Sequence, residues 1–252
     1  MDRTRTLDRA LSRAGLGSRT QARAWIEAGR VRVNGRVVRN PEAWIDPLSD
    51  HVTLDGGEVR AVPRVYLALH KPVGYLTTRT DPGGRATVYD LFDDLPAWVA
   101  PVGRLDRDTS GLLLFTNDSD LADRITDPLH HLPKTYVVTT RRVLADEAIE
   151  SLRRGVELLD GPTLPAKVRR LEPSGRRGRI ELVLREGRNR QVRRMLQAVG
   201  HTVAALERVA IGPVRLGTLA PGESRPLTSA ELARLRGGQG RGPVRRRRRG
   251  AA

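Results

Sequence analysis

Two short helices are predicted near the beginning of the chain. Apolar side chains recur at helical spacing over residues 7–15 and give this segment one apolar face. After two glycines, Ser18-Arg19-Thr20-Gln21 has the residue types of a capping box, in which the serine and the glutamine bind each other's backbone N–H groups. The box predicts the start of a second helix, which we expect to stop at Gly29.

A β-hairpin is predicted directly after these helices. Val31 and Val33 alternate with arginines, as in a strand with one buried face, and Asn34-Gly35 follows them. Asn-Gly is a strong hairpin signal because both residues tolerate the left-handed backbone of a tight turn. Residues 40–60 are acidic and rich in turn-forming residues, so we place a domain boundary at their end. The pattern predicts a small helix–helix–hairpin domain over residues 1–61.

The larger remainder, residues 62–236, contains strand and helix patterns in irregular order. Strands are predicted at 65–69, 111–115, 134–138 and 178–184. Helices are predicted at 144–154 and 188–199, and a last short helix is capped by Thr228-Ser229-Ala230-Glu231. Because these elements lack a regular strand–helix–strand rhythm, they favour an α+β domain.

Positive charge is concentrated at the two ends of the chain. The 252 residues contain 45 Lys and Arg against 29 Asp and Glu, a formal net charge of +16. Residues 1–39 and residues 236–252 contribute +7 each, so everything between them holds only +2. This distribution predicts a polyanionic partner, with nucleic acid the first candidate. Residues 237–252 are mainly Gly, Arg and Pro, and we expect them to form a disordered basic tail.

Composition excludes several classes of site. The chain has no cysteine, which excludes disulfides and thiolate chemistry, and no apolar run approaches the roughly 20 residues of a membrane helix. Its first residues lack the apolar segment of a signal peptide, so we expect a cytoplasmic protein with no membrane contact. We expect His130-His131 to lie in a loop, since metal ligands must converge on one point. The glycine pairs lack the rest of a nucleotide-binding motif, and we expect neither metal nor cofactor.

Two polar clusters could perform chemistry. Residues 103–111 combine two aspartates, two arginines and two hydroxyls in a loop before a buried strand. An aspartate beside an arginine stays ionised and could serve as a nucleophile or base, although a polar turn would have the same composition. Residues 185–194 place five arginines at the start of a predicted helix, where they could hold a phosphate or neutralise a carboxylate, or could form a solvated helix face.

Four motifs, in their order along the chain, resemble those of the RsuA/RluB family of ribosomal RNA pseudouridine synthases. Gly103-Arg104-Leu105-Asp106, with the Asp-Thr-Ser-Gly-Leu-Leu-Leu that follows, resembles the catalytic motif of that family. Lys71-Pro72 resembles its first motif, Lys134-Thr135-Tyr136 its tyrosine motif, and residues 186–195 its third. The first domain, with Ala-Gly-Leu-Gly-Ser-Arg and Gly-Arg-Val-Arg-Val-Asn-Gly, resembles an S4-like RNA-binding domain.

The resemblance implies a mixed or antiparallel sheet and an enzyme that isomerises a uridine of ribosomal RNA to pseudouridine without a cofactor. It implies that Asp106 acts on the ribose so that N1 is released and the base re-attaches through C5. It further implies that Tyr136 stacks on the flipped base and that Arg188 pairs with Asp106. RNA contacts are expected from ten basic residues: Arg19, Arg23, Arg30, Arg32, Lys71, Arg104, Lys134, Arg190, Arg193 and Arg194.

A second class of function stays open at this point. A non-catalytic RNA-binding protein, such as a ribosome-assembly or ribosome-rescue factor, could use the same head, although most of this chain would then need another purpose. An S4-linked RNA methyltransferase is disfavoured because no glycine-rich turn follows a predicted strand. Within the enzyme hypothesis we expect a monomer and favour 23S over 16S ribosomal RNA. The arginine tail could add RNA affinity or only solubility.

Overall fold

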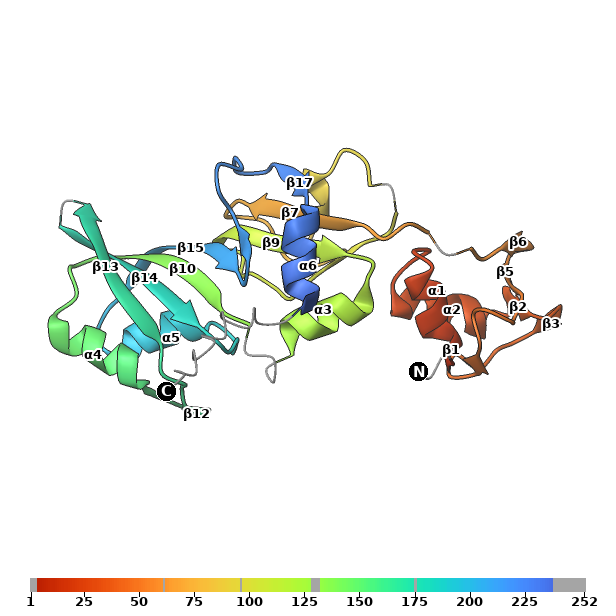
Figure 1. Ribbon diagram of the computed structural model, residues 1–252, viewed down its shortest axis with the longest axis horizontal. Coiled ribbons are helices and arrows are strands. Elements are labelled where there is room, and N and C mark those ends of the chain that lie inside the picture. The colour runs from red at the N-terminus through yellow and green to blue at the C-terminus, as the bar shows by residue number, and fades with distance from the viewer. Residues whose placement is uncertain (1–3, 61, 96, 128–131, 175, 238–252) are drawn as a thin grey trace, which may run out of the picture.

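The computed structural model describes residues 4–60, 62–95, 97–127, 132–174 and 176–237. A small N-terminal head lies at one end of the molecule, beside an elongated domain built around a twisted sheet (Figure 1). The predicted tail, except Gly237, and the His130-His131 pair lie outside the described residues.

The head begins with the two predicted helices, α1 (Leu7–Arg13) and α2 (Arg19–Glu27). The capping box is confirmed: the Gln21 backbone N–H donates to Ser18 Oγ at 3.1 Å, and the Ser18 N–H donates to Gln21 Oε1 at 2.9 Å. The apolar faces of both helices pack with the hairpin into a separate core. Its buried members are Leu7, Leu11, Ala22, Ile26, Val31, Ile45 and Val52.

The predicted hairpin is also confirmed, as β2 (Val31–Val33) and β3 (Arg36–Val37). Asn34 and Gly35 have φ of +50° and +79°, as a two-residue turn with the twist of a hairpin requires. The turn-rich segment that follows contains three short strands, of which β4 pairs with β1 at the start of the head and β5 extends the hairpin sheet. The head strands besides the hairpin are β1 (Arg5–Thr6), β4 (Trp44–Ile45), β5 (Val52–Leu54) and β6 (Gly57–Glu58).

The second domain is built on a mixed sheet, which confirms the α+β prediction. In the part of the chain that is described, nine strands join it in the order β13-β14-β10-β15-β9-β7-β17, with β16 beside β15 and β8 beside β9. Every pair is antiparallel except β9 with β15. These strands are β7 (Tyr66–Lys71), β8 (Ala100–Pro101), β9 (Ser110–Thr116), β10 (Lys134–Thr140), β13 (Lys167–Ser174), β14 (Arg177–Leu184), β15 (Val203–Ile211), β16 (Val214–Arg215) and β17 (Ser224–Pro226).

Strand β9 lies in the middle of the sheet and is buried on both faces, which explains its continuous apolar sequence. Leu112 and Leu114 pack with α3 (Ser119–Thr126) and α6 (Ser229–Gly237) on one face. Leu113 and Phe115 pack on the other face with the short helix η1 (Val88–Leu91). Strand β9 is therefore a rigid support for the loop that precedes it.

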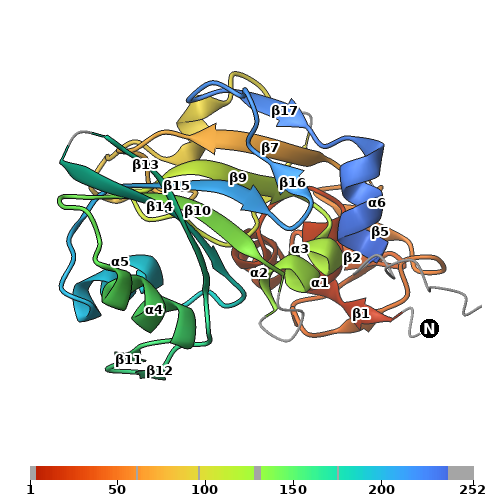
Figure 2. The same cartoon turned by 60° about the vertical axis from the view of Figure 1, so that its left-hand side comes forward.

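The far half of the sheet is covered by α4 (Asp146–Arg154) and α5 (Gln191–Ala198), which lie together on one face (Figure 2). A two-stranded hairpin of β11 (Glu157–Leu158) and β12 (Gly161–Pro162) follows α4. The last helix has its predicted capping box, since the Glu231 N–H donates to Thr228 Oγ1 and the Thr228 N–H donates to Glu231 Oε2.

Candidate active site

The loop of residues 103–109 is pinned to the segment that follows β7. The Gly74 N–H donates to the Arg107 carbonyl at 2.7 Å, and Arg107 Nε donates back to the Gly74 carbonyl at 3.1 Å. Thr77 Oγ1 donates to the Leu105 carbonyl at 2.7 Å. Loops usually move more than the strands they join, so these bonds restrict the position of Asp106 between them.

Lys71 lies underneath this loop and not on the surface. Its side chain is fully buried, and Nζ donates to the Thr109 carbonyl at 2.8 Å and to the Pro72 carbonyl at 2.9 Å. Burial lowers the pKa of Lys71 to about 8, while the carboxylates of Asp106 and Asp108 act in the opposite direction. The prediction that Lys71 contacts RNA is therefore wrong. The end of β7 directs its ammonium into the protein, where it links two loops by hydrogen bonds.

Lys71→Met should reduce the pH dependence of stability. Between pH 8 and the ordinary lysine pKa of 10.5, the unfolded chain binds the Lys71 proton more tightly than the folded protein. The free energy of unfolding should thus rise with pH in this window, by up to ~1.4 kcal/mol per pH unit. Urea unfolding should show this rise in the wild type and in Lys167→Met, which removes an exposed lysine, and a clearly smaller rise in Lys71→Met, where the partly buried Lys134 still contributes. Parallel profiles in all three proteins would contradict the buried charge.

Where the loop of residues 103–109 continues into β9, its backbone approaches the backbone of β15 closely. Gly111 has φ of +107°, and a Cβ at this position would lie 2.3 Å from the Arg208 carbonyl oxygen of β15. Arg208 is buried and its Nε donates to the Leu112 carbonyl at 2.8 Å. A glycine is therefore required where the single parallel strand pair of the sheet brings residues 110–111 against β15.

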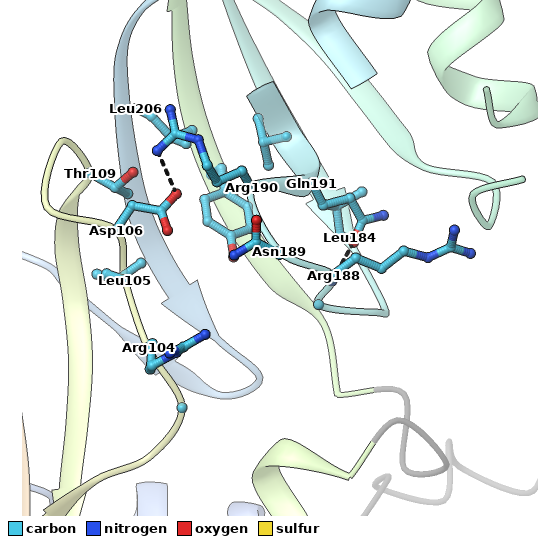
Figure 3. A pocket seen from close by; sticks show the side chains of 14 residues that line it. Arg104, Leu105, Asp106, Thr109, Leu184, Arg188, Asn189, Arg190, Gln191 and Leu206 are labelled. Atoms are coloured by element: carbon cyan, nitrogen blue, oxygen red, sulfur yellow. Dashed lines mark hydrogen bonds and ion pairs between the residues drawn. The ribbon is translucent and has the colours of Figure 1, made fainter. Parts of the chain in front are cut away.

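The arginine that faces Asp106 is Arg190. Helix α5 begins at Gln191 and not at residue 188, because Arg190 precedes it in the left-handed conformation with φ of +47°. Arg190 Nη1 lies 3.4 Å from Asp106 Oδ2 (Figure 3). The same Nη1 lies 3.1 Å from Asp108 Oδ1, and Nη2 lies 3.2 Å from Asp108 Oδ2. One guanidinium therefore bridges both carboxylates of the loop.

Arg188 does not pair with Asp106, and this expectation is wrong. Its guanidinium points away from Asp106 (Figure 3) and donates to the carbonyls of Asp160, Gly161 and Pro162 on the β11–β12 hairpin. Its Nε donates to Glu186 Oε2 at 3.2 Å. The later start of α5 places residue 188 on the outer side of a turn, so its charge fixes the hairpin and not the loop.

Asp108 is held more tightly than Asp106 by these cations. Arg193 Nη2 donates to the Asp108 carbonyl at 2.8 Å and lies 3.1 Å from its Oδ2. Burial acts against ionisation of Asp108, yet its hydrogen bonds from Arg190 and the charge of Arg193 hold its pKa below the ordinary value. The Asp106 side chain is 33% exposed and has one weak ion pair with the described residues, which leave its second oxygen open to a substrate.

Asp106 faces a cavity of about 310 Å³ between the loop and the start of α5. Tyr136 lies on its wall, at a register shift between β10 and β15 that follows Thr135. Arg104 lines the cavity from an exposed position, as expected for an RNA contact. The lining residues are Gly103, Arg104, Leu105, Asp106, Thr109, Tyr136, Leu184, Gly187, Arg188, Asn189, Arg190, Gln191, Val192 and Leu206.

The cavity combines an acid–base group with a slot of mixed polarity. Leu184 and Leu206 supply apolar wall, Asn189 supplies a hydrogen-bonding amide, and Tyr136 supplies an aromatic face. Such a lining suits a small planar heterocycle that carries polar edges. Sequence reasoning missed Leu184 and Leu206 because an apolar strand residue gives no sign of whether it faces a core or a cavity.

The other expected RNA contacts lie in different surroundings. Arg193 and Arg194 are largely shielded, and Arg194 forms a two-point ion pair with Asp160. Lys134 is partly buried on β10, and burial together with the charge of Arg208 lowers its pKa. None of these three presents an isolated, fully exposed charge to RNA.

The head arginines are organised by one buried carboxylate. Asp8 is fully buried, and its Oδ2 accepts from Arg19 Nε at 3.2 Å and Nη2 at 2.9 Å and from Arg23 Nη1 at 3.4 Å. Burial acts against ionisation of Asp8, but the Thr6 hydroxyl and the Arg19 guanidinium hold its pKa below the ordinary value. Arg19 and Arg23 keep half-exposed faces, so Asp8 orients them at the head surface.

Within the described ranges, no three His, Asp or Glu side chains converge as metal ligands would. None of the described helices is long and apolar enough to cross a membrane.

Comparison with known proteins agrees with this geometry. Residues 65–198 match the RNA pseudouridylate synthase family, and residues 5–43 match the S4 domain. The chain belongs to the RNA pseudouridylate synthase family. The matched range contains the loop of Asp106, the strand of Tyr136 and the turn of Arg190, and the family assigns the protein pseudouridine synthase activity on RNA.

Relatives match nearly the whole chain. "Ribosomal large subunit pseudouridine synthase B" of Bacillus subtilis is 39% identical over 232 residues, which cover 91% of this chain and 95% of that protein. "Ribosomal small subunit pseudouridine synthase A" of Yersinia pestis is 38% identical over 232 residues, covering 90% and 96%. A solved structure, "Crystal structure of pseudouridylate synthase", is 34% identical with a TM-score of 0.67 and covers 91% of this chain and 99% of that one.

Proposed function

We propose that this enzyme converts a specific uridine of 23S ribosomal RNA to pseudouridine, with Asp106 as the catalytic carboxylate. The observation that supports the role of Asp106 is its place on the cavity wall, where Arg190 holds one oxygen and the other is open to the cavity. Asp108, the competing carboxylate, has both oxygens engaged by arginines and does not line the cavity.

The proposed chemistry is an isomerisation that Asp106 can start in two ways. Its carboxylate either attacks C1′ of the ribose, which breaks the C1′–N1 bond and forms an ester, or takes a proton from C2′, which releases the same base. The detached uracil then turns and bonds to C1′ through C5. In the first route this displaces the carboxylate from C1′, and in the second route Asp106 returns its proton to C2′. The proton on C5 is lost and N1 gains one, and the reaction is balanced without an oxidant or a reductant.

The uridine must leave its stack before this chemistry can occur. Flipping a base costs a few kcal/mol, which contacts inside the pocket must offset. We propose that Tyr136 stacks on the flipped base and that Arg104, exposed at the cavity, contacts the RNA backbone. Arg190 supplies a fixed positive charge beside the reacting ribose, a preorganised arrangement that needs no rearrangement during the reaction.

The choice of ribosomal RNA rests on the relatives. A relative named for the large subunit and a relative named for the small subunit match with nearly equal identity, so 16S RNA is the alternative outcome of the test. Because the proposed substrate is ribosomal RNA, free or in an assembling subunit, we place the enzyme in the cytoplasm. We further propose that it acts as a monomer.

Pseudouridine mapping by carbodiimide-stop sequencing tests the function. Ribosomal RNA from a strain without this protein is compared with RNA from the same strain restored with the wild-type gene. We expect one 23S uridine to lose its mark and regain it on restoration. A 16S uridine behaving in this way would reassign the substrate, and an unchanged map of both RNAs would contradict the proposal.

Binding of RNA by the head should depend on Arg32 more than on Arg30. Arg30 forms a two-point ion pair with Asp55, whereas Arg32, among the described residues, donates only to the Gly35 carbonyl and has no carboxylate partner. Arg32→Gln should reduce the slope of log affinity against log salt by about 0.7–0.9, as the loss of one phosphate contact does. Arg30→Gln should change the slope by less than half of this. Equal slopes for the two variants in a titration with a ribosomal RNA fragment would contradict this difference.

A further inference from the structure

A second cavity lies where the head meets the sheet domain. It measures about 240 Å³, and we call it the junction notch. From the head, α1 contributes Arg9, Ser12 and Arg13, and α2 contributes Arg19. The sheet domain closes it with Trp98, Ala100, Thr116 and Asn117 and with three residues of α3, which are Ser119, Ala122 and Asp123.

Direct contacts hold the two sides of the notch together. Arg13 is 14% exposed; its Nε donates to Ser119 Oγ at 2.8 Å and its guanidinium forms an ion pair with Asp120. The backbone N–H of Trp98 donates to the Gly15 carbonyl at 3.3 Å. A Cβ on Gly15 would lie 2.3 Å from Val62 Cγ2, so the head also fits closely against the chain that connects it.

One guanidinium of the notch has no carboxylate partner among the described residues. Arg9, Arg13 and Arg19 line the notch with one carboxylate, Asp123, while Asp120 and Asp8, which do not line it, form ion pairs with Arg13 and Arg19. Arg9 makes no side-chain hydrogen bond or ion pair with any described residue. Burial and the neighbouring charges of Arg5, Arg64 and Arg9 lower the pKa of Arg13, because these cations lie close to one another.

A donor in the notch is also without a partner. Trp98 Nε1 is buried and has no hydrogen-bond acceptor among the residues that the structure describes. An unmade bond of a buried donor costs about 1–3 kcal/mol. The notch thus offers the Arg9 guanidinium and the Ser12 hydroxyl beside a tryptophan ring whose own N–H lacks an acceptor among the described residues, and the complement of this set is an anionic oxygen.

We propose that the junction notch binds a phosphodiester of the RNA strand, with Arg9 as its cationic ligand and the Trp98 ring on the adjoining wall. The inference rests on the proposed function for its choice of RNA over a free anion. Arg19 faces both the head surface and the notch, so a strand held by the head can continue into it. A phosphate there would contact both domains at once and hold the head in the position seen here, so that the junction helps to select the RNA.

The chain's three tryptophans provide a direct test in the full-length protein. With 5-fluorotryptophan, ¹⁹F NMR gives one resonance each for Trp25, Trp44 and Trp98, assigned by Trp→Phe variants. A ribosomal RNA fragment should shift the Trp98 resonance in the wild type and not in Arg9→Gln. Arg9→Gln should lower the salt slope of RNA affinity by about 0.7–0.9. The matched control Arg39→Gln alters a head arginine that donates to the Glu27 carbonyl away from the notch, and it should leave Trp98 unaffected.

Three results would overturn the proposal. Trp98 could be insensitive to RNA, Arg9→Gln could bind with the slope of Arg39→Gln, or inorganic phosphate alone could shift Trp98 as RNA does while Arg9→Gln keeps full RNA affinity. A pseudouridine assay on the same preparations separates the two hypotheses. An active wild type with an indifferent Arg9→Gln contradicts only the notch, and a notch that binds RNA in an inactive protein contradicts only the proposed function.

Discussion

Asp106→Asn is expected to lower pseudouridine formation at least ~10³-fold while it leaves RNA affinity within about two-fold. The amide has nearly the shape of the carboxylate and can still accept from Arg190, so the loop should keep its position. It cannot attack C1′ or take a proton from C2′, because it carries no basic oxygen. Single-turnover tritium release from [5-³H]uridine RNA measures the rate, and filter binding of the same RNA measures the affinity.

Asp108→Asn is the matched control, because it alters the other carboxylate of the same loop and also loses charge opposite Arg190. We expect this variant to lose about 10–100-fold in rate, since the role of Asp108 is to position Arg190. Product from Asp106→Asn at a rate near that of the wild type would remove Asp106 from the mechanism. If Asp108→Asn were instead the inactive variant, the roles of the two aspartates would have to be exchanged.

Elements defined by local chemistry could be predicted from the sequence. The capping boxes at Ser18 and Thr228 and the Asn34-Gly35 turn depend on side chains within three residues of one another, and all three are present. Strand β9 was recognisable because burial on both faces demands an uninterrupted apolar run.

Elements defined by distant partners were not predicted. β15 contains Glu207 and Arg208 in its centre, which obscures its apolar pattern, and Arg208 is accommodated only because Leu112 of β9 accepts its hydrogen bond. The edge strand β13 has two adjacent arginines, Arg169 and Arg170, and α3 is only eight residues long. In each case tertiary contacts override a weak local pattern.

In the candidate site, too, the features set by local sequence could be predicted and those set by distant contacts could not. Residue types in the two polar clusters and the motif order pointed to the loop of Asp106 and to the arginines before α5. Which arginine reaches Asp106 depends on where the helix begins, and a shift of the start from residue 188 to Gln191 changes the answer from Arg188 to Arg190. The burial of Lys71 likewise depends on the position at which β7 ends.

Arg190→Gln should therefore cost far more activity than Arg188→Gln. We expect Arg190→Gln to reduce the single-turnover rate about 10²–10³-fold, because it removes the only cation paired with Asp106 among the described residues. Arg190→Lys keeps the positive charge but cannot span both carboxylates, so its rate should fall between those of the wild type and Arg190→Gln.

Arg188→Gln should act on stability instead. It removes the donor to three carbonyls of the β11–β12 hairpin, which should lower the free energy of unfolding by about 1–3 kcal/mol, with a rate loss below about ten-fold. Urea unfolding and single-turnover rates of the three variants, measured on the same RNA, give the comparison. Equal rate losses in Arg188→Gln and Arg190→Gln would mean that the charge of either arginine acts on Asp106, and the assignment of Arg190 as its partner would fail. A large loss of rate confined to Arg190→Gln, with the loss of stability confined to Arg188→Gln, is the result that the geometry of this turn requires.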